Sequence, residues 1–148
     1  MPGLEDLYRE IILDHYREKH HSGLREPYQA EVHHVNPSCG DELTLRVQID
    51  DGEFTDISYD AEGCSISQAS VSIMTDLLIG NSVGHAMELH DQFLEVMHSQ
   101  GAITPDEDVF EDAIAFAGVS KFPARVKCAL LGWSAMKDAT MQATADAG

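Results

Sequence analysis

The stretch that decides the fold runs from Leu43 to Ala61 and reads LTLRVQIDDGEFTDISYDA. Apolar residues occupy every second position of its first half, and the same alternation returns from Ile57 onward. Period-two alternation is typical of a strand with one buried face and one wet face. Between the halves, residues 50–53 (DDGE) supply turn-forming side chains. The stretch therefore predicts a β-hairpin.

A third strand and several helices are expected around this hairpin. Residues from Ala30 to Val35 are the expected third strand, because two strands alone are marginally stable. Helical spacing of apolar residues predicts helices at about 4–17, 64–79, 83–97 and from 123 onward. Residues 104–107 (TPDE) match a capping box, so a further helix is expected from there to Gly118. We therefore expect an α+β fold, in which helices pack on one face of a small antiparallel three-stranded sheet.

The length of the chain predicts its domain organisation, and its charge excludes some classes of function. The 148 residues are expected to form one domain, 1–148, with a small, polar tail at 139–148 that frays. Nine Lys and Arg against 26 Asp and Glu give a net charge of −17. Such a surface repels phosphate backbones and anionic lipid heads. We expect neither nucleic-acid binding nor membrane binding.

The compartment is expected to be the cytoplasm. The N-terminus carries acidic residues where a signal peptide has a basic start, and no apolar run approaches the roughly 18 residues of a membrane span. The cysteines are Cys39, Cys64 and Cys128, an odd number at wide spacing, which does not suit a disulfide-stapled scaffold. Reduced thiols are expected.

Residues 36–41, NPSCGD, join the first two expected strands and are the first candidate site. A loop rich in Asn, Pro and Gly bends the backbone and aims side chains. Cys39 and Asp41 point the same way if the chain there is extended, and together they could bind a divalent metal. The alternative is structural, with Cys39 as an apolar filler and Asp41 capping a turn. The loop alone leaves both open.

The other two cysteines also lie at the ends of expected elements. Cys64 falls where a strand ends and a helix begins, and helix N-termini stabilise thiolates. Cys128 follows Arg125 and Lys127, whose positive charges also favour a thiolate. With Asp41, the three thiols make a ligand set that tetrahedral zinc accepts and that could also hold an iron–sulfur cluster. The spacings match no compact zinc-finger pattern, so a shared site needs further support.

That support is a resemblance. Asn-Pro-Ser-Cys-Gly-Asp at 36–41, Glu-Gly-Cys at 62–64 and Phe-Pro-Ala-Arg-Val-Lys-Cys at 122–128 resemble, in order, the three cysteine motifs of the NifU/IscU family of iron–sulfur assembly proteins. The similarity extends from Leu4 to about Met136. It implies that Cys39, Asp41, Cys64 and Cys128 are the metal or cluster ligands.

Two departures point to one branch of this family. IscU-type scaffolds usually have His directly before the third cysteine, where this chain has Lys127, and they lack an inserted helical segment of the kind found here at about 99–118. Both features are typical of the SufU-type branch. The resemblance thus implies a zinc-dependent sulfurtransferase that accepts persulfide sulfur from a SufS-type cysteine desulfurase and serves downstream Suf components.

The expected mechanism gives each site residue a role. Zinc on three thiolates and one carboxylate carries a formal charge of 2 − 4 = −2, which Arg125 and Lys127 would offset. Cys39, being on the loop, is the expected sulfur acceptor, and would become a persulfide. Asp41 would be the hard, weakly held ligand that keeps the site labile.

Two other functions stay open. One is a scaffold on which a [2Fe–2S] cluster is assembled on the same residues and passed on. The other is a metal-free interaction module whose cysteines merely pack. The histidines, among them His20, His21, His33 and His34, are expected to be surface or packing residues, because no pair has the spacing of a metal-binding helix face.

Overall fold

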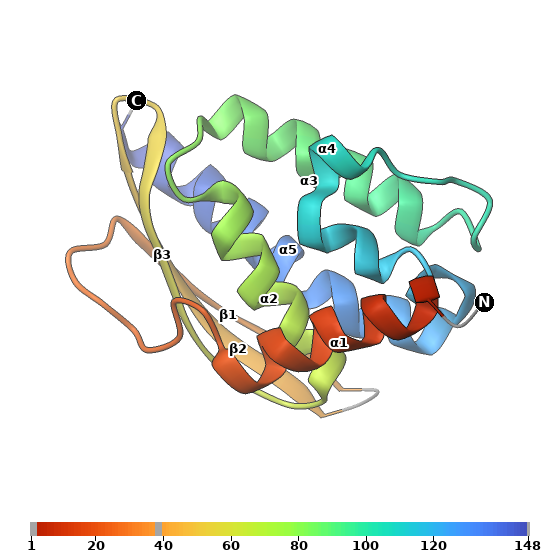
Figure 1. Ribbon diagram of the computed structural model, residues 1–148. Helices are drawn as coiled ribbons and strands as arrows, with labels where there is room; N and C mark the ends of the chain where they lie inside the picture. Colours follow the sequence, from red (N-terminus) through yellow and green to blue (C-terminus); the bar gives the residue numbers. More distant parts are fainter. Residues whose placement is uncertain (1–2, 38–39, 148) are drawn as a thin grey trace.

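The computed structural model describes residues 3–37 and 40–147. Its elements follow the order shown in Figure 1, with three strands: β1 (Ala30–Asn36), β2 (Asp41–Asp50) and β3 (Glu53–Glu62). The α-helices are α1 (Gly3–Glu18), α2 (Ser65–Leu78), α3 (Val83–Met97), α4 (Glu107–Phe110) and α5 (Pro123–Ala147). Two 3₁₀ helices, η1 (Glu111–Phe116) and η2 (Val119–Lys121), lie between α4 and α5. The predicted α+β fold is confirmed.

The sheet is antiparallel, with the strand order β1-β2-β3. Residues of β2 alternate between buried and half-buried along the strand, as the period-two pattern predicts. The hairpin turn uses Asp51 and Gly52, both at positive φ, which is the geometry that favours Gly there. Asp41, at the start of β2, pairs with Asn36, and its neighbour Glu42 pairs with Glu62. The end of β1, the start of β2 and the end of β3 therefore meet at one end of the sheet.

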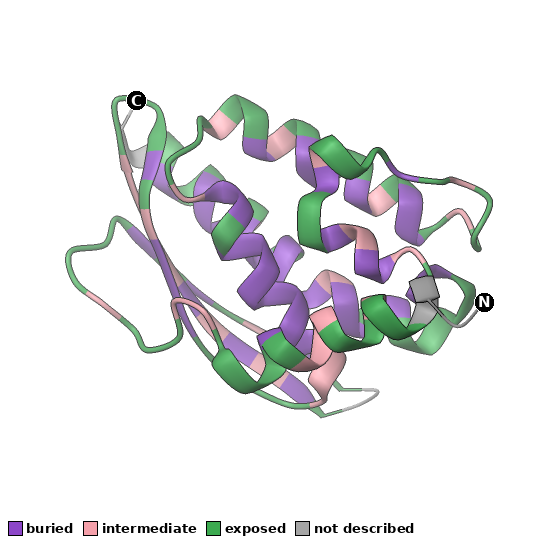
Figure 2. Ribbon diagram, in the orientation of Figure 1, coloured by how far each residue is buried: buried purple, intermediate pink, exposed green. Residues whose placement is uncertain are grey.

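The helices cover one face of this sheet, with α2 and α5 against the strands (Figure 1). Buried residues are concentrated between this helical layer and the sheet (Figure 2). On α5, the ring of Trp133 stacks on Phe93 of α3 with centroids 4.6 Å apart. Next to it, a Cβ at Gly132 would lie 2.9 Å from Cβ of Val71, so α2 and α5 pack too closely there for a larger residue. This close packing fixes the two helices that carry Cys64 and Cys128.

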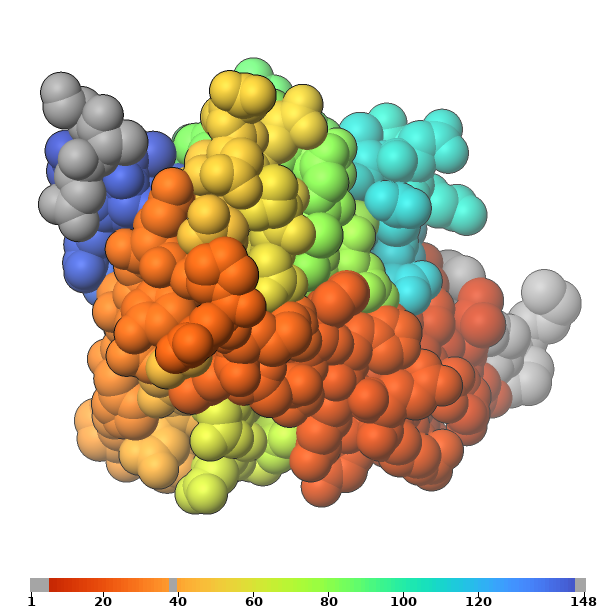
Figure 3. All heavy atoms as spheres, turned by 90° about the vertical axis from the view of Figure 1, so that its left-hand side faces the viewer, coloured from red at the N-terminus to blue at the C-terminus, as the bar shows by residue number. Residues whose placement is uncertain are grey.

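The segment between α1 and β1 packs along the outer edge of β3. The N–H of Gly23 donates to the carbonyl of Tyr59 at 2.7 Å, and Arg25 forms an ion pair with Asp56 at 2.6 Å. The carboxylate raises the pKa of Arg25 above its usual value, chiefly through this hydrogen bond. Figure 3 shows the segment, in orange, against the yellow of β3. It covers a strand edge that would otherwise be open to pairing.

The prediction of one helix from residue 104 to Gly118 is wrong. α4 has four residues, its N-cap is Asp106 rather than Thr104, and the chain leaves the helical conformation at Glu111, where φ is +47°. Phe110 and Phe116 both pack against Phe93. Residues six apart lie about 120° apart around an α-helix, so one continuous helix could not point both rings at the same partner. Tertiary packing overrides the local capping signal here.

The tail expected to fray from residue 139 is instead part of α5, which continues to Ala147. Ala139 and Ala143 are buried. On the same helix Asp138 lies 2.9 Å from His34 of β1, and this hydrogen bond is the main cause that lowers the pKa of the Asp138 carboxyl. The composition of this segment looks polar, but its small residues let α5 pack closely against the sheet, and so Ala139 and Ala143 are buried. Across residues 3–37 and 40–147, no helix is both long and apolar enough to cross a membrane.

Candidate metal centre

Asp41 lies at the end of the sheet where the three strands meet. It is the first residue of β2, and its side chain is fully buried. An ionised carboxylate is stable in such a place only when it is paired or hydrogen-bonded. Two of its contacts come from the same end of the sheet, where β3 passes into α2.

Cys64 is the N-cap of α2 and is half-buried. Its backbone N–H donates to Oδ1 of Asp41 at 2.8 Å, and its Sγ lies 3.5 Å from Oδ2 of the same carboxylate. The hydroxyl of Ser67 lies 3.8 Å from Sγ and itself donates to the Cys64 carbonyl at 3.1 Å. One carboxylate therefore both caps the helix backbone and contacts the thiol.

Cys128 lies in the second turn of α5 and is buried. The hydroxyl of Ser70 on α2 donates to the carbonyl of Ala129 at 2.6 Å, which joins the two helices beside this cysteine. One ligand atom from each of Asp41, Cys64 and Cys128 lies within 4.8 Å of the other two. The structure thus brings together three of the four predicted ligands. The fourth, Cys39, lies outside the described residues.

The donor set suits a zinc ion. With Zn–S near 2.3 Å and Zn–O near 2.0 Å, a tetrahedral zinc separates a sulfur ligand from an oxygen ligand by about 3.5 Å. The distance between Cys64 Sγ and Asp41 Oδ2 is 3.5 Å. Two thiols and a carboxylate at this spacing, largely withdrawn from water, can chelate one ion.

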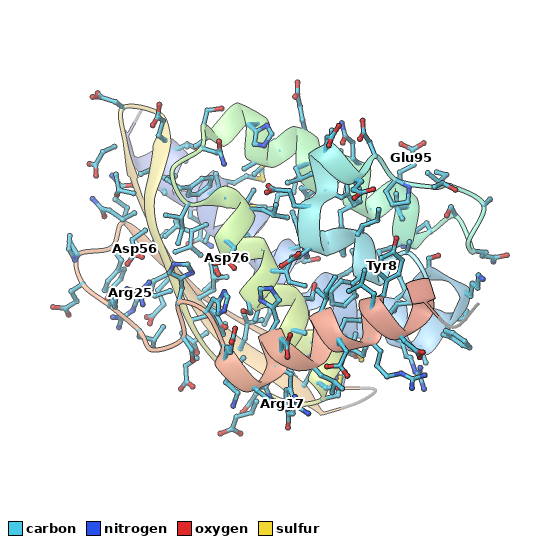
Figure 4. The ribbon with its side chains drawn as sticks, in the orientation of Figure 1. Tyr8, Arg17, Arg25, Asp56, Asp76 and Glu95 are labelled. Atoms are coloured by element: carbon cyan, nitrogen blue, oxygen red, sulfur yellow. The ribbon has the colours of Figure 1, made fainter. Side chains whose placement is uncertain are left out.

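The two predicted supporting cations are exposed residues near the start of α5, the helix that carries Cys128. Arg125 is exposed, with its guanidinium 5.1 Å from the ring centroid of Phe122. It lines a groove of about 490 Å³ together with Ser65, the residue after Cys64, and Tyr8 of α1, which is labelled in Figure 4. Lys127 is exposed on α5, about 100° around the helix from Cys128. Both charges therefore lie on the solvent-exposed surface of the first turns of α5.

Gly63 is a site residue that the sequence reasoning missed. It has φ +144°, and a Cβ built there would lie 2.0 Å from Oδ1 of Asp41. Only glycine lets the backbone approach the carboxylate this closely. The Glu-Gly-Cys order was visible, but the contact with a residue 22 positions earlier was not.

We expect Gly63→Ala to destabilise the metal-free protein by about 2–4 kcal/mol, because it adds a steric clash to backbone strain. Urea denaturation measures the change. The matched control is Gly52→Ala, which also sits at positive φ but has nothing within 4 Å of the added Cβ. A loss no larger for Gly63→Ala than for this control would show that Gly63 does not define the Asp41 pocket.

The histidines include both exposed and buried residues, as expected of surface and packing positions. His15 is buried, and it lies with His20 and Asp76 in a second group whose ligand atoms are within 4.8 Å of one another. His33 is exposed, as expected, and His34 is half-buried against Asp138. Spacing along the chain could not reveal the second group, because Asp76 comes from a different helix.

Comparison with known proteins supports one family over most of the chain. Residues 7–129 match the NifU-like N terminal domain. Over 136 residues the chain is 41% identical to the iron-sulfur cluster assembly scaffold protein IscU of Streptococcus pyogenes serotype M1, covering 92% of this chain and 84% of that protein. It is 38% identical to the zinc-dependent sulfurtransferase SufU of Bacillus subtilis strain 168, covering 91% and 90%.

Solved structures agree with the fold. A crystal structure of an iron-sulfur cluster assembly scaffold protein for the SUF system of Fervidobacterium islandicum AW-1 superposes with a TM-score of 0.81 at 34% identity, covering 93% of this chain and 98% of that one. The N-terminal part of a NifU-like protein from Brucella abortus superposes with a TM-score of 0.84 at 25% identity, covering 95% and 96%.

Proposed function

This chain belongs to the family of NifU-like N-terminal domains, and on that basis we propose that it serves iron–sulfur cluster biogenesis as a zinc-dependent sulfurtransferase. It accepts persulfide sulfur from a SufS-type cysteine desulfurase and passes it to downstream Suf cluster-assembly components. The main support is the group of Asp41, Cys64 and Cys128, whose spacing suits one tetrahedral zinc. Lys127, in place of a histidine before Cys128, favours sulfur transfer over cluster scaffolding.

Four residues would hold the ion in this proposal: Cys39, Asp41, Cys64 and Cys128. Bound zinc would keep the three thiols deprotonated near neutral pH. Asp41 supplies the one oxygen ligand, which zinc holds less firmly than thiolate sulfur. The formal charge of −2 would be offset in part by Arg125 and Lys127, which lie on the same helix as Cys128.

The sulfur-transfer step uses Cys39 as the nucleophile. Its thiolate attacks the outer sulfur of the desulfurase persulfide, a new S–S bond forms to Cys39, and the original S–S bond breaks. The desulfurase cysteine leaves as a thiolate, and Cys39 carries the persulfide with its proton. One neutral sulfur atom moves between two thiolates, so no external oxidant or reductant is required.

The second candidate function is a scaffold for a [2Fe–2S] cluster on the same four residues. It is favoured by the name of the relative from Streptococcus pyogenes, at 41% identity. Three cysteines and a carboxylate also satisfy the ligand preference of such a cluster. The metal content of the protein as purified separates the candidates: about one zinc supports the sulfurtransferase, whereas a brown chromophore supports the scaffold. Absence of any metal would support the metal-free interaction module.

Mutation of Lys127 distinguishes the sulfurtransferase from the cluster scaffold. A lysine ammonium has no lone pair with which to ligate iron, whereas a neutral imidazole has one. We expect Lys127→His to keep zinc and to make cluster reconstitution easier, measured by visible absorption after incubation with iron and sulfide.

We expect Lys127→Ala to weaken desulfurase stimulation by about two- to fivefold without emptying the site, as for loss of one exposed charge contact. Lys137→Ala is the matched control, because Lys137 is exposed on the same helix about 15 Å farther along. Loss of zinc from Lys127→Ala, with an intact circular dichroism spectrum, would contradict the role given to this lysine.

A further inference from the structure

A second group of ligand-type side chains lies at the other end of α2. His15 is in the last turn of α1, His20 follows that helix by two residues, and Asp76 is in the last turn of α2. One ligand atom of each lies within 4.8 Å of the other two. Asp76 and Cys64 are 12 residues apart, which is about 18 Å along a helix, so this group is separate from the cysteine site. Figure 4 labels Asp76 on α2.

Hydrogen bonds hold both imidazoles in place. Nδ1 of His15 lies 2.8 Å from Oγ of Ser72, and the same oxygen accepts the backbone N–H of His20 at 2.9 Å. Nε2 of His20 lies 2.7 Å from a carboxylate oxygen of Glu18. Metal-binding histidines characteristically donate their second ring N–H to a hydroxyl, carbonyl or carboxylate in this way, which fixes the tautomer. In each imidazole one ring nitrogen is therefore held by a hydroxyl or a carboxylate oxygen.

The other ring nitrogen of each imidazole faces a carboxylate. Nε2 of His15 lies 3.0 Å from Oδ2 of Asp112 on η1, and Nδ1 of His20 is hydrogen-bonded to Oδ2 of Asp76. His21 adds a third imidazole, with Nδ1 3.4 Å from Oδ1 of Asp76 and 3.0 Å from Oγ1 of Thr75.

The local field favours a positive charge at this position. The side chains of Asp76, Glu18 and Asp112 place three carboxylate charges around the imidazoles of His15 and His20. A divalent cation would neutralise most of this charge, and the overall charge of −17 also attracts cations.

We propose that His15, His20 and Asp76 form a second metal site, which takes a divalent ion of the zinc class. Two imidazole nitrogens and one carboxylate oxygen match the ligands that Zn²⁺, Co²⁺ and Ni²⁺ accept, whereas Mg²⁺ and Ca²⁺ prefer sites made wholly of oxygen. His15 is 4% exposed, while the side chains of His20 and Asp76 are 35% and 38% exposed. The ion is therefore reached from solvent and keeps open positions for water. Once bound, it ties the end of α1 to α2.

The test is the number of zinc ions bound per full-length chain, measured by equilibrium dialysis and elemental analysis. We expect the wild type to bind one ion more than either His20→Ala or Asp76→Asn, both of which leave buried His15 in place. Their affinity for that ion should fall about tenfold or more, as losses of even supporting groups weaken metal sites by 10- to 100-fold. His85→Ala is the matched control, because His85 is exposed on α3, and it should keep the second ion.

The second ion should also remain in Cys64→Ala, which separates this inference from the proposed function. Equal zinc binding by the wild type, His20→Ala and Asp76→Asn would overturn the second site. So would loss of the second ion from His85→Ala, since binding would then not depend on the group.

Discussion

Cys64→Ala is expected to lose the zinc of the cysteine site. Cys64 Sγ lies 3.5 Å from Asp41 Oδ2 and within 4.8 Å of the ligand atom of Cys128, so its loss removes one of three thiolates from the proposed set. Loss of a mere supporting group weakens metal sites by 10- to 100-fold, so loss of a direct ligand should cost more than about 100-fold. Elemental analysis of the purified variant after dialysis measures the change.

Ser67→Ala is the matched control for this prediction. The Ser67 hydroxyl lies 3.8 Å from Cys64 Sγ but is not in the ligand set, so the variant should retain zinc. Cys128→Ala should behave like Cys64→Ala. Asp41→Ala should still bind metal but exchange it differently, because water replaces the one oxygen ligand. Undiminished zinc in Cys64→Ala or Cys128→Ala would rule out a shared site.

Cys39→Ala is expected to abolish stimulation of a SufS-type desulfurase. In the proposed step the Cys39 thiolate is the nucleophile, and alanine offers no atom to which the sulfur can be transferred. Alanine release from cysteine, followed with and without the variant, should fall to the rate of the desulfurase alone. Since removal of a nucleophile typically costs several orders of magnitude, no partial activity is expected.

A metal assay must accompany this experiment, because Cys39 is also a proposed zinc ligand. Cys64→Ala keeps Cys39 and is expected to lose zinc, so comparison of the two variants separates loss of the acceptor from loss of the metal. Full stimulation by Cys39→Ala would remove this residue from the acceptor role. If the wild type stimulates no desulfurase but assembles and passes on a cluster, the scaffold function is correct.

The sheet and α3 could be predicted from sequence because their signals are local. Alternation in residues 43–49 reports which side chains face the core, and it matches the burial of β2 from Leu43 to Gln48. The register shift that follows leaves Ile49 half-buried. The helix from Val83 to Met97 was predicted with the same bounds, since apolar spacing and the turn at residues 80–82 agree. Where local pattern and tertiary packing point the same way, the sequence is sufficient.

The two incorrect secondary-structure predictions concern segments whose conformation depends on contacts with residues far away in the sequence. The capping signal at residues 104–107 competes with burial of Phe110 and Phe116 against Phe93, and the packing wins. The tail from Ala139 looks polar and small, but small residues are what close packing against a sheet requires. The sequence of each segment does not show which distant residues it packs against.

The candidate site could likewise be predicted only in part. Spacing alone could not join Asp41, Cys64 and Cys128, and the resemblance to a family supplied the connection that the strand pairing now explains. The approach of Gly63 to Asp41 joins residues 22 positions apart, and the contact of His20 with Asp76 joins residues 56 positions apart. These residues are of common types, and only the folded chain brings them together.

Mass spectrometry of the zinc-loaded protein after incubation with desulfurase and cysteine tests the central claim most directly. The claim is that this chain carries sulfur on Cys39 while zinc stays on the same site. The predicted result is one additional sulfur atom per chain, located on the peptide that contains Cys39, with about one zinc per chain remaining at the cysteine site. A chain that gains no sulfur, or that gains it only on Cys64 or Cys128, would contradict the proposal.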